Sequence, residues 1–185
     1  MSEIRSIEQL NEVYSQPRDI VRQKVRPTLD TYTTRFIEHS AFALLSSIDS
    51  DGFTDISPKG GVPGFIKVAD DRTLLIPDGA GNNRVDSLRN ILCNPGVGLL
   101  FMVNGVNEVV RVKGRASIHR DEELFRLCPD GEKAPKVVIK VCIESVFFHC
   151  PKALTVGKLW EDDYRVERSF LPSLAEIVKS QVGSE

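Results

Sequence analysis

Short β-prone segments, each ended by a cluster of glycine, proline, asparagine or aspartate, recur along most of this chain. The clearest is the segment 109–118, where apolar and basic residues alternate at a period of two, as in a strand with one buried and one exposed face. Similar segments span 40–47, 53–57, 65–68, 73–77, 97–102 and 137–149. Because short, closely spaced strands with few helices favour a curled antiparallel sheet, the pattern predicts a small antiparallel β-barrel of about six or seven strands.

Composition limits the classes of protein to which the chain can belong. The 185 residues are 41% hydrophobic and 27% charged, which is ordinary for a soluble domain that can bury a core without disulfides. The net charge of −2 and the scattered basic residues predict no nucleic-acid partner and no membrane-surface partner. No apolar run is long enough to span a membrane, and the polar start is unlike a signal peptide, so we expect a cytoplasmic protein.

The cysteines and histidines indicate no metal site. Cys93, Cys128, Cys142 and Cys150 form no C-x-x-C pair, and the three histidines are scattered. Because a zinc site needs four ligands at characteristic spacings, these residues predict buried free thiols and no bound metal.

The chain divides into an arm and a domain. Residues 1–28 have the Ser-x-x-Gln pattern that begins a helix and a proline at position 17 that interrupts it, which predicts an N-terminal helical arm. Residues 29–185 hold the strand segments and end in an amphipathic helix over 171–178 that we expect to begin at a proline. We interpret the arm as a packing element that covers the barrel or a partner subunit.

The most informative stretch, 73–102, reads as strand, turn-rich loop, helix and strand. Asn82 and Asn83 are predicted to cap the helix, with Arg84 and Ser87 one turn apart on one face. Unpaired backbone N–H groups, a guanidinium and a hydroxyl at one helix start suit a phosphate monoester. The plainer alternative is an ordinary cap with a solvated arginine.

Two further places carry polar groups in unusual settings. The Gly- and Pro-rich segment 58–64 should end the second strand near Ser57, and Ser57 and Lys59 then point to the same side, where they could meet a phosphate or the polar edge of a ring. Trp160, flanked by Lys152 and Lys158 in an irregular polar segment, could form a wall against a flat ligand. A solvated lysine and an interface tryptophan are the corresponding alternatives.

These stretches together resemble the FMN-binding split barrels related to pyridoxamine 5′-phosphate oxidase, and most closely a bacterial branch with the same tail. The resemblance covers roughly residues 30–178 and is carried by DISPKGG (55–61), the IPD–GNNRVDSLRNILCNP block (76–95), VGLLF (97–101), VRVKGRA (110–116) and HCPKAL with LW (149–160).

The resemblance implies a mainly β, α+β fold: a six-stranded antiparallel split β-barrel with flanking helices, forming a homodimer that holds two FMN molecules in its interface. Ser57 and Lys59 would lie along the flavin ring and ribityl chain, and Trp160 with Lys152 or Lys158 would approach from the second subunit. Arg84 and Ser87 would take the phosphate. The supporting contacts would come from Asn83 and Arg89 and from the backbone of Ile76, Pro77 and Asp78.

One departure argues against a true pyridoxamine phosphate oxidase. The tail after Trp160 is acidic and has no histidine, so it would repel a phosphorylated substrate. We therefore expect an FMN-dependent oxidoreductase for another small molecule, with Lys59 tuning the flavin. The alternatives are a flavin-binding or redox-sensing protein without turnover, and a haem-handling split barrel with His149 as axial ligand. Binding of a deazaflavin in place of FMN is a further alternative.

Overall fold

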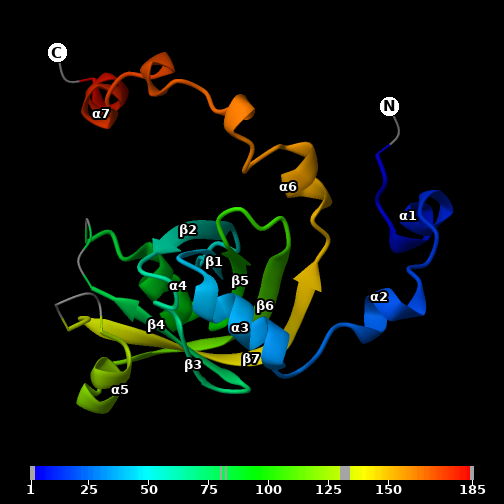
Figure 1. Ribbon diagram of the computed structural model, residues 1–185, viewed down its shortest axis with the longest axis horizontal. Coiled ribbons are helices and arrows are strands. Elements are labelled where there is room, and N and C mark those ends of the chain that lie inside the picture. Colours follow the sequence, from blue (N-terminus) through cyan, green and yellow to red (C-terminus); the bar gives the residue numbers. More distant parts are fainter. Residues whose placement is uncertain (1–2, 80, 82, 130–133, 184–185) are drawn as a thin grey trace.

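Seven antiparallel strands form one sheet in the computed structural model, which describes residues 3–79, 81, 83–129 and 134–183. The order across the sheet is β2-β1-β5-β6-β7-β4-β3 (Figure 1). The strands are β1 (Phe42–Ile48), β2 (Thr54–Gly60), β3 (Lys67–Asp70), β4 (Thr73–Asp78), β5 (Gly96–Met102), β6 (Val109–His119) and β7 (Val137–His149). This confirms the expected antiparallel split-barrel architecture, although the short edge strand β3 brings the number of strands to seven rather than six.

Helices occupy the ends of the chain and the connections between strands (Figure 1). They are α1 (Ile7–Val13), α2 (Asp19–Gln23), α3 (Thr31–His39), α4 (Asp86–Cys93), α5 (Glu122–Leu127), α6 (Lys152–Val156) and α7 (Leu174–Val182), with short 3₁₀ turns η1 (Asp162–Tyr164) and η2 (Arg168–Phe170). Ser6 caps α1 and Asp30 caps α3 through side-chain hydrogen bonds, as the sequence predicts. The prediction for the last helix was wrong in one respect, because α7 begins after Ser173, which forms a capping box with Glu176.

The core lies on the inner face of the curled sheet. Leu45, Phe101 and Ile139 are fully buried there, and each comes from the inward-facing set of an alternating strand. Ile37 of α3 and Ile91 of α4 enter the same cluster, so the two helices close the inner face. A second, smaller cluster forms where α5 covers the beginning of β7.

Strand β2 is longer than the sequence predicts. It continues through Pro58 to Gly60 instead of ending at Ser57, and it pairs with β1 along its whole length. A proline is tolerated because β2 is an edge strand, where a missing backbone donor leaves no gap between two ladders. Lys59 is therefore held by a strand and not by a loop.

The terminal segments stand away from the sheet (Figure 1). None of the residues of α1, α2 or α7 is buried. The N-terminal arm joins the barrel at Arg26, which exchanges backbone hydrogen bonds of 3.0 and 2.8 Å with Val146 of β7. The boundary that we place after residue 28 stays a prediction. Within the described part of the chain, no helix combines the length and the apolar composition needed to cross a bilayer.

Gly114 of β6 faces β7 next to a register shift in the pairing of the two strands. A Cβ atom at this position would meet the carbonyl oxygen of Cys142, and it would lie 2.9 Å from a methyl carbon of Val141. Backbone cannot move aside as a flexible side chain can, so only glycine lets the two long strands bend together here.

We therefore expect Gly114→Ala to lower the free energy of unfolding by about 2 kcal/mol or more. The matched control is Gly98→Ala in β5, where the nearest atom to the new Cβ is 3.8 Å away. Urea unfolding of both variants measures the difference. Equal stabilities would show that the sheet does not depend on this close approach.

Candidate functional site

A half-buried ion pair joins two strands that are far apart in the sheet order. The Nζ atom of Lys59 on β2 lies 2.7 Å from Oδ2 of Asp78 at the end of β4, and the two side chains are 17% and 24% exposed. Since four strands separate β2 from β4 in the sheet order, this contact requires the sheet to curl back on itself. The pair therefore marks the place where the split barrel closes.

The face of β2 that carries Lys59 is fixed to helix α4. Asp55, Ser57 and Lys59 alternate with exposed neighbours and form the half-buried face of the strand, as the two-residue spacing predicts. Asn90 of α4 donates hydrogen bonds to the hydroxyl of Ser47 at 3.0 Å and to the carboxylate of Asp55 at 3.4 Å. The body of α4 is thereby held beside β1 and β2.

The start of α4 differs from the prediction. The residue at the N-cap position is Val85, which has no capping hydrogen bond and adopts a left-handed backbone with φ of 51°. The predicted cap by Asn83 was therefore wrong: its backbone is also left-handed, with φ of 59°, and its side chain accepts a hydrogen bond from Lys136 at 3.4 Å. Asn82 lies outside the described residues.

Arg84 and Ser87 are consequently not on one helical turn. Arg84 precedes the helix, and its Nε atom contacts the carboxylate of Asp86 at 2.8 Å on the surface. Ser87 is the second residue of α4 and is only 6% exposed. Arg89, on the same helix, is exposed. A hydroxyl within the first helical turn and a guanidinium just before it still suit an anion, because backbone N–H groups and the helix dipole point the same way.

Lys136 is a member of this site that the sequence did not indicate. Its backbone N–H donates to the carbonyl of Asp78 at 2.9 Å, and its Nζ atom donates to the side chain of Asn83. It thus ties the chain before β7 to the loop after β4. No local pattern around Lys136 could have revealed this, since the contact joins residues more than fifty positions apart.

The described contacts form a continuous set: Lys59 to Asp78, Asp78 to Lys136, and Lys136 to Asn83. Ile76 is fully buried in β4, and Pro77 continues that strand to Asp78. One ammonium, that of Lys59, therefore contacts the Asp78 carboxylate, and a second, that of Lys136, contacts the side chain of Asn83 shortly before α4 begins. Such an arrangement can bind an anion and can present a cation to the edge of a polar ring.

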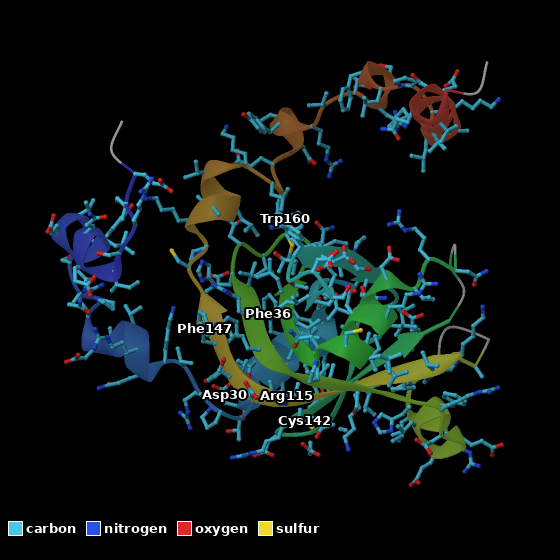
Figure 2. All side chains as sticks on the ribbon, turned by 180° about the vertical axis from the view of Figure 1, so that it is seen from behind. Asp30, Phe36, Arg115, Cys142, Phe147 and Trp160 are labelled. Atoms are coloured by element: carbon cyan, nitrogen blue, oxygen red, sulfur yellow. The ribbon has the colours of Figure 1, made fainter. Side chains whose placement is uncertain are left out.

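The tail residues lie apart from this set. Residues 152–156 form the helix α6, so the prediction of an irregular segment was wrong over that part. Lys152 is exposed at the start of α6, and Lys158 contacts Glu161 at 3.2 Å. The indole Nε1 of Trp160 donates to the carbonyl of Val106 at 3.0 Å, where the tail leaves the sheet (Figure 2). No contact of these side chains among the described residues joins them to Lys59 or Asp78.

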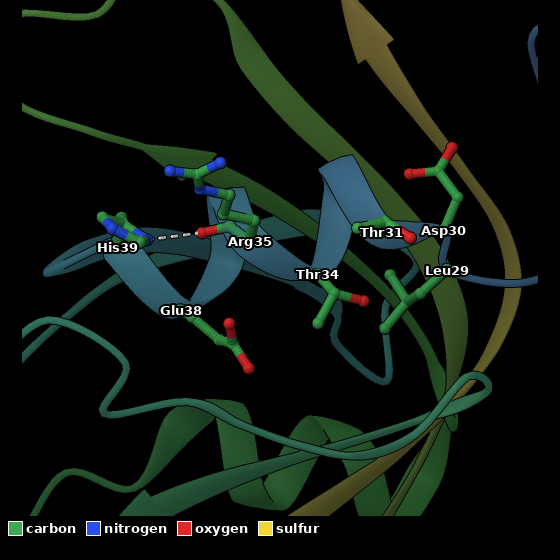
Figure 3. A pocket seen from close by; sticks show the side chains of 7 residues that line it. All are labelled: Leu29, Asp30, Thr31, Thr34, Arg35, Glu38 and His39. Atoms are coloured by element: carbon green, nitrogen blue, oxygen red, sulfur yellow. Dashed lines mark hydrogen bonds between the residues drawn. The ribbon is translucent and has the colours of Figure 1, made fainter.

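Two hollows on the described surface lie elsewhere. The larger, about 760 Å³, is open and follows the outer side of α3 (Figure 3). It is lined by Leu29, Asp30, Thr31, Thr34, Arg35, Glu38 and His39. The smaller, about 220 Å³, lies between the N-terminal arm and the end of β7. Neither hollow includes Lys59, Asp78 or Ser87.

The cysteines and His149 do not add chemistry to this surface. Only Cys128 is buried, and burial raises the pKa of its thiol, whereas Cys93, Cys142 and Cys150 are exposed, contrary to the prediction of buried thiols. Burial, together with the nearby charges of Arg111 and Lys24, lowers the pKa of His149.

Comparisons with known proteins agree with this architecture. The sequence profile of the family described as "Pyridoxamine 5'-phosphate oxidase" matches residues 30–150. HupZ of Group A Streptococcus has 19% identity and a TM-score of 0.55, over 65% of this chain and 93% of that protein. A proposed pyridoxamine 5′-phosphate oxidase of Lactobacillus delbrueckii subsp. has 22% identity and a TM-score of 0.53, over 66% and 95%. At these identities the two structures show the fold alone. No curated protein sequence matches the chain.

The Lys59–Asp78 pair should behave as one coupled unit. Asp78→Leu leaves a half-buried ammonium without its partner, and we expect a loss of about 2 to 3 kcal/mol in the free energy of unfolding. The double variant Lys59→Met/Asp78→Leu should recover most of this loss, because it removes both charges together.

A double-mutant cycle in urea measures the coupling. The exposed pair of Glu122 and Arg126 in α5 is the control, and Glu122→Ala should cost about 0.5 kcal/mol or less. Additive effects of the two substitutions at 59 and 78 would contradict the interpretation that the pair closes the barrel.

Proposed function

Because this chain belongs to the pyridoxamine 5′-phosphate oxidase family, we propose that it binds FMN and acts as an FMN-dependent oxidoreductase on a small organic molecule. The observation that carries the proposal is the placement of Lys59 on a rigid edge strand, joined by contacts through Asp78 and Lys136 to the loop that precedes α4. A cation for the ring and a helix start for the phosphate then lie on one surface.

The phosphate would lie at the start of α4. Ser87 and the backbone there supply neutral donors, and Arg84 supplies a guanidinium, with Asn83 and Arg89 in support. Asp78 is a poor neighbour for a phosphate, but its carboxylate is already engaged by Lys59 at 2.7 Å. The residues present are thus suited to a phosphate at the helix and a neutral ring beside the ion pair.

The ring would lie along β2 and the end of β4. Ser57 and Lys59 offer a hydroxyl and a cation from the same face of β2, and Ile76, Pro77 and Asp78 offer backbone groups. Bound flavin would supply the hydride chemistry, and the protein would orient the ring and tune its potential. Lys59 is the residue we assign to that tuning.

The second wall of the site would come from another copy of the chain. We propose a homodimer with two FMN sites, each completed by Trp160 and by Lys152 or Lys158 of the other subunit. One observation favours this: the terminal segments expose many apolar side chains. The acidic segment after Trp160 makes pyridoxamine phosphate an unfavourable substrate.

Binding of FMN and riboflavin to the same protein tests the phosphate site. The wild type should bind FMN much more tightly than riboflavin, and Arg84→Ala and Ser87→Ala should each weaken FMN binding about tenfold or more while leaving riboflavin nearly unchanged. Fluorescence titration measures both constants, with the exposed Arg126→Ala as control.

If these substitutions weakened the binding of FMN and of riboflavin equally, the phosphate of FMN would not bind at the start of α4. A wild type without flavin bands that also fails to bind added FMN would refute the flavoprotein assignment. A haem spectrum would favour the haem-handling alternative, and a deazaflavin bound in place of FMN would change the ring but keep the phosphate site.

Lys59→Met tests the ring position. Loss of a cation beside the ring should make the midpoint potential more negative, by about 30 mV for each 1.4 kcal/mol of stabilisation lost by the reduced, anionic ring. Spectroelectrochemistry measures the shift, with Lys179→Met on the exposed helix α7 as control. An unchanged midpoint potential would show that Lys59 does not lie beside the flavin ring. Turnover with NAD(P)H and an acceptor separates an enzyme from a protein that only binds or senses flavin.

A further inference from the structure

The C-terminal arm, residues 159–182, exposes apolar side chains along its whole length. Phe170 is 64% exposed and Leu174 is 72% exposed, and no residue of α7 is buried. The exposed apolar residues of the arm are Leu159, Tyr164, Val166, Phe170, Leu171, Leu174, Val178 and Val182. A folded monomer rarely leaves so continuous a set in water, because each buried side chain would gain about 1.5 to 3 kcal/mol. The exposed set therefore marks the arm as a candidate docking element.

The outward face of β6 carries a row of cations. Arg111, Lys113 and Arg115 are all exposed, and their two-residue spacing places them about 7 Å apart along the strand. Among the described residues no carboxylate lies within 4.0 Å of any of them. Glu144 is exposed on β7 near this row and makes no ion pair within that distance with any described residue.

Next to this row the sheet offers room for an extended segment. Gly98 and Gly96 of β5 are the cross-strand partners of Lys113 and Arg115, so no side chain rises from β5 beside those two cations. At the other end of the row, Arg111 lies 5.5 Å from the ring centre of Phe147. This outward face of the sheet therefore combines a row of cations with two neighbouring glycines and an aromatic ring at one end.

The arm has the complementary chemistry. Glu161, Asp162 and Asp163 are consecutive and exposed, and they stand between Leu159 and Tyr164. Their present partners, Lys158 and Arg165, lie within three to five residues in the same exposed segment, where ion pairs contribute little. An acidic, apolar segment and a basic sheet face beside two glycines thus occur in one chain, with no ion pair between them among the described residues.

We propose that the C-terminal arm of one copy docks on the outward face of β6 of a second copy, with Glu161, Asp162 and Asp163 against Arg111, Lys113 and Arg115. This inference rests on the homodimer of the proposed function and specifies which surfaces hold it together. A second copy is favoured over the arm's own barrel because Trp160 fixes the root of the arm at Val106, and the segment beyond it runs clear of its own sheet (Figure 1). In a two-fold symmetric dimer each subunit would dock its arm on the other subunit, so both arms would be covered by the same contacts.

A nucleic acid is a poorer occupant of this face. The row holds three cations and the whole chain has a net charge of −2, so few phosphates could be neutralised and the rest of the surface would repel a polyanion.

Chemical cross-linking between isotopically light and heavy chains tests the proposal on the native protein. The two forms are mixed until native mass spectrometry shows mixed dimers and are then treated with a carbodiimide, which joins Lys113 only to a carboxylate in direct contact. We expect links from Lys113 to the 161–163 segment that combine one light and one heavy peptide. Links confined to peptides of one isotope, or no link between these segments, would overturn the proposal.

Charge reversal gives the second test. Glu161→Lys/Asp162→Lys/Asp163→Lys should raise the dimer dissociation constant about tenfold or more at low salt. Adding Arg111→Glu/Lys113→Glu/Arg115→Glu to the same chain should restore the dissociation constant of the wild-type dimer. The control is Glu122→Lys/Glu123→Lys on α5, which should leave association unchanged. Sedimentation velocity measures all three variants, and circular dichroism checks their folding.

The outcomes separate this inference from the function on which it rests. A dimer that persists unchanged after reversal of the arm refutes the docking while leaving the homodimer in place. A wild type that sediments as a monomer refutes both. FMN titration of the same samples reports on cofactor binding independently of association.

Discussion

The contact between Lys59 and Asp78 is the constraint on which the rest of the structure depends. It connects an edge strand to β4 across a sheet in which the two strands are not neighbours, so it can exist only when the sheet is curled. Desolvating two charges is costly, and an apolar pair of similar volume would hold the strands at least as well. Stability alone therefore does not explain a charged pair at the point where the barrel closes, whereas a functional role of Lys59 does. The same contact thus closes the fold and positions the residue that we assign to the proposed flavin site.

The sequence predicts the sheet well because strand formation here follows local patterns. Alternation along β6 indicates both its length and its two faces, and glycines at 52 and 105 take the positive φ that their turns need. Asp30 begins α3 as a capping residue should. In each case the cause of the structure lies within a few residues of the feature, so a single sequence is sufficient to read it.

The predictions that were wrong concern features whose cause lies far away in the sequence. Nothing near Asn83 shows that its side chain turns to Lys136, and nothing near Pro58 shows that its strand lies at an edge where proline is tolerated. Both depend on partners or on a position that only the assembled sheet defines. The left-handed backbone at Val85, unusual for a β-branched residue, similarly reflects how the loop is held at both ends rather than its own preference.

The terminal arms extend this argument beyond one chain. Their apolar stripes predict helices, and the helices form, but a stripe does not say what covers it. In the single chain the stripes stay exposed, so in the proposed homodimer association would cover them, and stability would then depend on protein concentration. Trp160 lies at the root of the C-terminal arm and also belongs to the proposed flavin site. If the arm orders only in the dimer, the second wall of that site forms only then, and cofactor binding and dimerisation should favour one another.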